Sequence, residues 1–86
     1  MYILNDKIII KKRDSIYFGL NMETGSTLEM NESQYSIISF FSGKPKSKEE
    51  LLEYLKKAYL VDEDTLKKDV DISMNVLLSE NILQHV

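Results

Sequence analysis

Apolar and polar residues follow two different spacings along the chain, and the change falls near residue 31. Before it, short β-branched, aromatic or alternating runs predict strands over residues 7–13, 16–21 and 26–30. The breaks between these runs consist of turn residues, which favours three short antiparallel strands. Alternation predicts a common inner face made by Ile8, Ile10, Ile16, Phe18, Leu20, Leu28 and Met30. The residues expected to point the other way are Ile9, Lys11, Tyr17, Thr27 and Glu29.

After residue 31 the apolar spacing is that of helices, and each expected helix begins at a residue that can cap it. The caps are Asn31 with Gln34 for the first helix, Ser47 with Glu50 for the second and Asp62 for the third. Gly43 can end the first helix, and Asn81 stands where a left-handed residue is expected after the third. Three strands followed by three helices predict an α+β domain with a winged helix-turn-helix-like arrangement.

The third expected helix carries apolar residues on two faces. The natural core face is one stripe, made by Leu66, Val70, Met74 and Leu77. Ile72 and Val76 lie outside that stripe and share their side of the helix with Thr65, Lys68 and Asp69. Two interpretations of this pair remain open: either it covers the first helix or the sheet, or it lines a groove.

Composition and charge narrow the classes of function. The chain has 86 residues, of which 43% are hydrophobic and 29% charged, which is typical of one small globular domain. No apolar run approaches the ~18 residues that span a bilayer, and the first residues lack a signal-peptide pattern, so we expect a cytoplasmic protein with no membrane partner. With no cysteine and a single histidine, His85, neither a metal site nor a cofactor is expected. The net charge of −3 argues against a general polyanion binder.

The ordered set of motifs resembles the PqqD-like proteins, which are recognition elements for ribosomally synthesised, post-translationally modified peptides (RiPPs). The family's hairpin, its Leu-x-x-Asn-Glu start of the first helix, the glycine after that helix and its second helix are matched by METGSTLEMNESQYSIISFFSGKPKSKEELLEYL. The family's Asp-Val third helix and its closing Gly-Leu-Leu-like motif are matched by VDEDTLKKDVDISMNVLLSENIL. The resemblance covers about residues 7–83. It departs from the family at Met30, where leucine is commoner, and at Asn81, which replaces glycine.

This resemblance implies a single PqqD-like domain over residues 1–86, with its core at about 7–83. It also implies that a leader peptide adds as an antiparallel strand to the edge of the third strand and places side chains in a cleft against the third helix. The implied peptide-binding residues are Ser26, Thr27, Leu28, Glu29 and Met30 on the strand, and Lys68, Asp69, Ile72 and Val76 on the helix. The chain fits a stand-alone protein slightly better than the N-terminal domain of a larger enzyme.

Three classes of function follow from these observations. The preferred one is a non-catalytic module that binds a precursor leader peptide and delivers it to a modifying enzyme, which the resemblance implies to be a radical SAM enzyme, a lasso-type leader protease or a cyclase. The alternative is a winged-helix DNA-binding regulator. It is disfavoured because the third helix carries four carboxylates against two lysines, so no nucleic-acid partner is expected. An enzyme is the third class, but the sequence offers no catalytic constellation, and we expect no catalytic residues.

Overall fold

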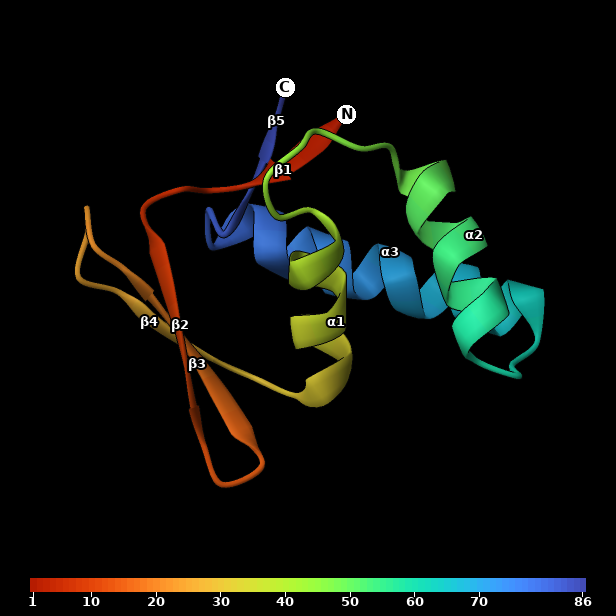
Figure 1. Cartoon of the computed structure of the whole chain (residues 1–86), viewed down its shortest axis with the longest axis horizontal. Helices are drawn as coiled ribbons and strands as arrows, with labels where there is room; N and C mark the ends of the chain where they lie inside the picture. Colours follow the sequence, from red (N-terminus) through yellow and green to blue (C-terminus); the bar gives the residue numbers. More distant parts are fainter.

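The computed structural model describes residues 1–86 and has a mixed α+β fold with an antiparallel sheet and three helices (Figure 1). The elements are β1 (Tyr2–Leu4), β2 (Ile8–Arg13), β3 (Ile16–Asn21), β4 (Thr27–Met30), α1 (Glu32–Phe40), α2 (Lys48–Ala58), α3 (Glu63–Ser79) and β5 (Leu83–His85). The three strands and three helices expected from the sequence are confirmed as β2 to β4 and α1 to α3. None of the helices combines the length and the apolar character needed to cross a membrane.

The larger sheet has the order β2-β3-β4, and its register corrects the expected inner face. Residues directly opposite each other in an antiparallel pair share a face of the sheet. Gly19 lies opposite Ile10 and Leu28, whereas Phe18 lies opposite Lys11 and Glu29. The predicted inner and outer faces of β3 were therefore wrong: the odd-numbered residues face inward and the even-numbered residues face outward. The side chains on the outer face with Ile9, Lys11, Thr27 and Glu29 are Ile16, Phe18 and Leu20, and the inner face has Tyr17, Gly19 and Asn21 instead.

The length of the first turn explains this parity. Arg13 pairs with Ile16, so only Asp14 and Ser15 connect β2 to β3, and Asp14 takes a left-handed conformation with φ of 57°. A two-residue connection places even-numbered residues of β2 opposite odd-numbered residues of β3. Tyr17, which was expected to point outward, accordingly stacks on Tyr35 of α1 with ring centroids 4.0 Å apart.

Gly19 allows the sheet to lie close to the core. A Cβ atom at this position would lie 3.1 Å from Cε of Met30 and 3.6 Å from Cδ1 of both Ile10 and Ile82. The space above the centre of β3 is thus filled by side chains from β2, β4 and the end of the chain. The buried apolar core consists of Met30, Ile37, Ile38, Phe41, Leu51, Leu55, Leu66, Val70, Met74, Leu77, Ile82 and Leu83.

The helices begin at the predicted caps. Asn31 and Gln34 form a reciprocal capping box, in which each side chain accepts a hydrogen bond from the amide of the other residue. The amide of Glu50 donates to the Ser47 hydroxyl over 3.1 Å, and that of Thr65 donates to Asp62 over 3.2 Å. These contacts satisfy amides in the first turn that have no partner within the helix.

The end of α3 turns through Asn81, which is left-handed with φ of 59°, as predicted. The amide of Ile82 donates to the carbonyl of Leu77 and the amide of Asn81 donates to that of Leu78. These two bonds form a Schellman motif, which folds the following residues back onto the helix. Ile82 and Leu83 are consequently buried in the core.

A second sheet joins the two ends of the chain and was not predicted from the sequence. β1 and β5 pair antiparallel, with Tyr2 opposite His85 and Leu4 opposite Leu83, and Figure 1 shows both termini together. On its other side, Tyr2 exchanges two main-chain hydrogen bonds of 2.8 and 2.9 Å with Lys46. The three-residue strands are too short to give a clear alternation, so pairing rather than local sequence defines them.

Candidate peptide-binding groove

β4 is an end strand of its sheet, and two of its residues present unpaired main-chain groups. Hydrogen-bonded and non-hydrogen-bonded pairs alternate along an antiparallel ladder. The amide of Asn21 donates to the carbonyl of Ser26 over 2.9 Å, so the next pair in the β3–β4 ladder has no such bond. It follows that the amides and carbonyls of Thr27 and Glu29 point toward the open edge, whereas those of Leu28 point to β3.

The other two expected edge residues contribute less to this edge. The Ser26 carbonyl accepts from Asn21, and its amide donates to the hydroxyl of Thr24 over 3.2 Å. Met30 is only 2% exposed and packs against Gly19. The side chains along β4 therefore alternate between exposed Thr27 and Glu29 and the inward-facing Leu28 and Met30.

On α3 the structure separates the two predicted apolar stripes. Leu66, Val70, Met74 and Leu77 are all buried, which confirms the core stripe. Ile72 is 57% exposed, so the interpretation that it covers the first helix or the sheet is wrong. Val76 is half-buried, whereas Lys68 and Asp69 are exposed and take part in none of the ion pairs.

Ion pairs fix which flank of α3 faces α2. Asp71 pairs with Lys48 of α2, and the Glu63 carboxylate lies 2.9 Å from Lys56 Nζ. The hydrogen bond and the charge of Lys56 lower the pKa of Glu63, and the same contact raises the pKa of Lys56. The opposite flank of α3 carries Asp69, Ser73, Val76 and Glu80 at helical spacings of four, three and four residues, so these side chains form one line along the helix.

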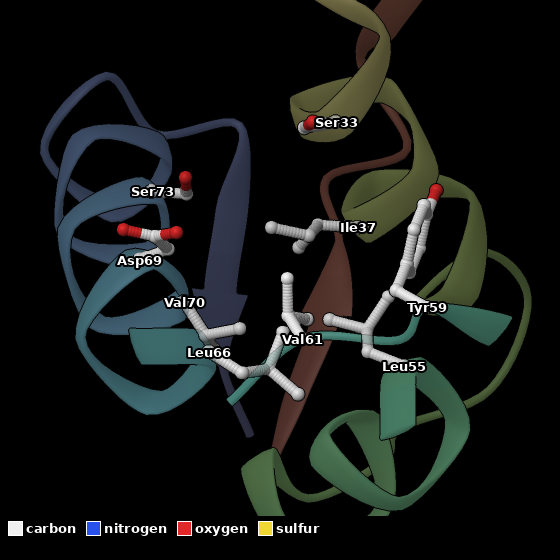
Figure 2. Close-up of a pocket in the computed structure, with 9 residues that line it drawn as sticks. All are labelled: Ser33, Ile37, Leu55, Tyr59, Val61, Leu66, Asp69, Val70 and Ser73. Carbon is white, nitrogen blue, oxygen red and sulfur yellow. The ribbon is translucent and has the colours of Figure 1, made fainter. Parts of the chain in front are cut away.

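A hollow of about 170 Å³ lies at the N-terminal end of this line (Figure 2). Its apolar lining is Ile37, Leu55, Tyr59, Val61, Leu66 and Val70. Ser33 from the first turn of α1 faces Asp69 and Ser73 of α3 across the hollow. The site thus combines an apolar interior with three polar side chains, one of them a carboxylate.

A smaller hollow lies at the other end, where β4 approaches the end of α3. Ser26, Thr27 and Leu28 line it together with Glu80 and Ile82. Thr27 thus lies near Glu80, whereas Ser33, which follows β4 in the chain, lies near Asp69. β4 and the start of α1 therefore run antiparallel to the line of side chains on α3. We call the surface that joins these two hollows the β4–α3 groove. Its residues are Ser33, Asp69 and Ser73 from the larger hollow, Thr27, Leu28 and Glu80 from the smaller one, and Val76, which lines neither hollow but lies between Ser73 and Glu80 on α3.

The groove brings together only part of the predicted site. It joins Thr27 and Leu28 at one end with Asp69 at the other, and Val76 lies between these ends on α3. Ile72 and Lys68 lie further around the helix and line neither hollow. The sequence did not predict a role in the site for Ser33, Tyr59, Val61, Ser73 and Glu80. Helical spacing from Asp69 and Val76 points to Ser73 and Glu80, whereas the others depend on how α1 and the α2–α3 linker pack.

Comparison with known families identifies the chain. The family model of coenzyme PQQ synthesis protein D (PqqD) matches residues 17–83. The chain belongs to the PqqD family. The resemblance noted in the sequence is thereby confirmed, and the match runs from the second residue of β3 to the first residue of β5, including every residue of the groove.

A solved structure shares the PqqD-family fold of this chain. It is described as TbiB1 in complex with the TbiA(beta) leader peptide, with a TM-score of 0.79 and 20% sequence identity. The alignment covers 98% of this chain and 96% of that chain, so the likeness of fold includes the terminal strands. The search of curated proteins found no match.

Proposed function

We propose that this PqqD-family protein is a recognition module that binds the leader peptide of a ribosomally synthesised, post-translationally modified peptide. The observation that carries the proposal is the open edge of β4, where Thr27 and Glu29 direct unpaired amides and carbonyls beside a groove with an apolar hollow. Support comes also from TbiB1, a protein of the same fold whose solved structure contains a leader peptide.

Strand addition explains how such a site can bind an extended peptide. Main-chain hydrogen bonds to Thr27 and Glu29 supply affinity that depends little on the peptide sequence, while alternate side chains of the peptide enter the groove and give specificity. Leu28, Asp69 and Val76 are the predicted groove residues within reach of those side chains. Ile72 and Lys68 form the outer wall, where a bound peptide would cover the exposed apolar surface of Ile72.

The module acts by delivery and not by chemistry. Binding the leader holds the attached core segment near a modifying enzyme and raises its local concentration. The enzymes that fit this role are a radical SAM enzyme, a lasso-type leader protease or a cyclase, acting in the cytoplasm where the precursor is made. We assign the winged-helix-like arrangement to peptide binding because Glu63, Asp64, Asp69 and Asp71 on α3 would repel a DNA backbone.

The test is a titration of the isotope-labelled protein with the leader peptide encoded beside its own gene, with a scrambled leader as the control. We expect saturable backbone amide shifts at residues 26–30 and along residues 69–80. A folded protein that responds to neither peptide, or that responds equally to both, would contradict the proposal. A short DNA duplex, added to the protein in the same buffer, tests the alternative function. Amide shifts of the protein that appear with the duplex but not with the leader peptide would favour a DNA-binding regulator.

A further inference from the structure

The outer face of the β2-β3-β4 sheet, turned away from the helices, has an apolar centre. Figure 1 shows the three helices on one side of this sheet. Ile16, Phe18 and Leu20 follow one another along the outer side of β3, and Ile9 of β2 lies opposite Leu20. Ile9 is 38% and Ile16 37% exposed, and none of the four side chains packs against the buried core. A contiguous apolar surface of this kind is typical of an interaction site.

Charges flank this apolar centre with opposite signs. Lys11, Phe18 and Glu29 lie directly opposite one another across the three strands. Lys11 and Arg13 therefore form a basic column along β2, whereas Glu29 gives the β4 side a negative charge at the level of Phe18. All three charged side chains are exposed, and none forms an ion pair within the chain.

We propose that this face binds a second copy of the chain, with a twofold axis parallel to β3. Such an axis places β3 over β3, and β2 of each copy over β4 of the other, which is a self-complementary arrangement. Phe18 then meets Phe18 of the partner subunit, and Lys11 faces Glu29 of the partner subunit in two symmetry-related contacts. Face-to-face sheets keep their strands within about 30° of each other, so this register holds over the short strands.

The geometry also sets the strength of the association. Three strands of at most six residues offer a face about 15 Å by 20 Å, which is smaller than a standard protein interface. We therefore expect a weak dimer whose population depends on protein concentration. The open edge of β4 lies in the plane of the sheet and stays accessible, so the dimer does not depend on the proposed leader binding.

Reciprocal charge exchange tests the arrangement by sedimentation from about 10 μM to 1 mM protein, a range suited to weak association. Lys11→Glu and Glu29→Lys each replace two attractive contacts by two repulsive ones, and we expect each to raise the dimer Kd by about tenfold. Combining both changes in one chain restores attraction with the signs reversed. Mixing the two single variants should give a heterodimer stronger than either homodimer, although both variants keep a net negative charge.

Two controls separate the face from general effects of charge and solubility. Lys12→Glu makes the same charge change one residue away but on the inner face, so the dimer should persist. Phe18→Asp should abolish it, whereas Leu60→Asp, at a fully exposed leucine in the α2–α3 linker, should not. Amide spectra would verify that each variant is folded.

Three results would overturn the proposal. The first is a wild-type protein that remains monomeric at about 1 mM, a concentration high enough to populate even a weak dimer. The second is a mixture of the two charge variants that associates no better than each variant alone. The third is a dimer that Phe18→Asp leaves intact. If the protein is monomeric and Phe18→Asp slows peptide modification without changing leader affinity, the face belongs to the modifying enzyme instead.

Discussion

Thr27 lies directly opposite Leu20 in a pair that exchanges no main-chain hydrogen bonds, so both polar groups of its backbone point away from the sheet. Its neighbour Leu28 is turned the other way and bonds to β3. The accessible edge of β4 is thus set by the register of the β3–β4 hairpin. A ligand strand would pair with Thr27 and Glu29 and leave the existing ladder intact.

Proline at Thr27 tests this pairing. The substitution removes one donor from the open edge but none from the β3–β4 ladder, so the protein should stay folded. Loss of a main-chain hydrogen bond worth about 1 kcal/mol, together with local strain, should weaken leader binding about five- to tenfold in a calorimetric titration. Lys12→Pro is the matched control, because the Lys12 amide points outward at the opposite edge of the same sheet. Equal affinities for the two variants would argue against strand addition at β4.

Charge at Ile72 tests the outer wall of the groove. Ile72 is more than half exposed, so Ile72→Asp should change the unfolding temperature little. If the bound leader covers this side chain, burying a carboxylate there should weaken binding about tenfold or more. Asn75→Asp adds the same charge to the exposed back of α3 and should bind the leader normally. Normal binding by folded Ile72→Asp would remove Ile72 from the site.

Filling the space at Gly19 tests the close packing of the sheet. Gly19→Leu would force Met30 and Ile82 apart, because even a Cβ at this position lies within 3.1 to 3.6 Å of their side chains. We expect a loss of about 1 to 3 kcal/mol in the free energy of unfolding, measured with urea. Gly19→Ala should cost less, since the flexible end of Met30 can move. An unchanged urea midpoint for Gly19→Leu would show that the core tolerates this volume.

The ion pair between Lys56 and Glu63 predicts a small pH dependence. Because contact with Lys56 lowers the folded-state pKa of Glu63, its contribution to stability is present above the unfolded pKa and is lost as pH falls through the folded value. The raised pKa of Lys56 acts oppositely: its contribution is present below pH 10.5 and is lost as pH rises through the folded value. Both groups are exposed, so salt should weaken the effect.

The titration of Glu63, followed by carboxyl carbon shifts, measures this coupling directly. Its midpoint should lie below that of an ordinary glutamate and should rise in Lys56→Met. Lys57→Met serves as the control, because Lys57 forms no ion pair. A Glu63 midpoint that is the same in all three proteins would show that the contact between the helices does not persist in solution.

Local chemistry made most of the fold predictable from the sequence. Asn31, Ser47 and Asp62 cap their helices as expected, and Asn81 adopts the left-handed conformation, because each acts through neighbours within a few residues. The face of β3 was wrong because alternation defines two faces without saying which one is inside. The two-residue turn at 14–15 contained that information, because its length determines which residues of β3 lie opposite the inward-facing residues of β2.

The predicted site depended more on tertiary packing than the caps did. The second stripe of α3 indicated a surface apart from the core, and the exposure of Ile72 agrees with that. The hollow beside Asp69 could not be foreseen, since Ser33, Tyr59 and Val61 come from separate elements that local spacing does not bring together. Met30 was predicted both on the inner face of the sheet and on the binding edge; its side chain contacts Gly19, which confirms the inner face.

The pairing of β1 with β5 gives this chain an unusual order of assembly during translation. Leu83 is 1% exposed and belongs to the core, yet it is synthesised after all three helices. The hairpins and helices can form locally as they emerge, whereas the contact between the two ends closes a loop of nearly the whole chain. A ribosome stalled before residue 82 should therefore hold a loosely packed intermediate, open to proteases until β5 has been synthesised and can pair with β1.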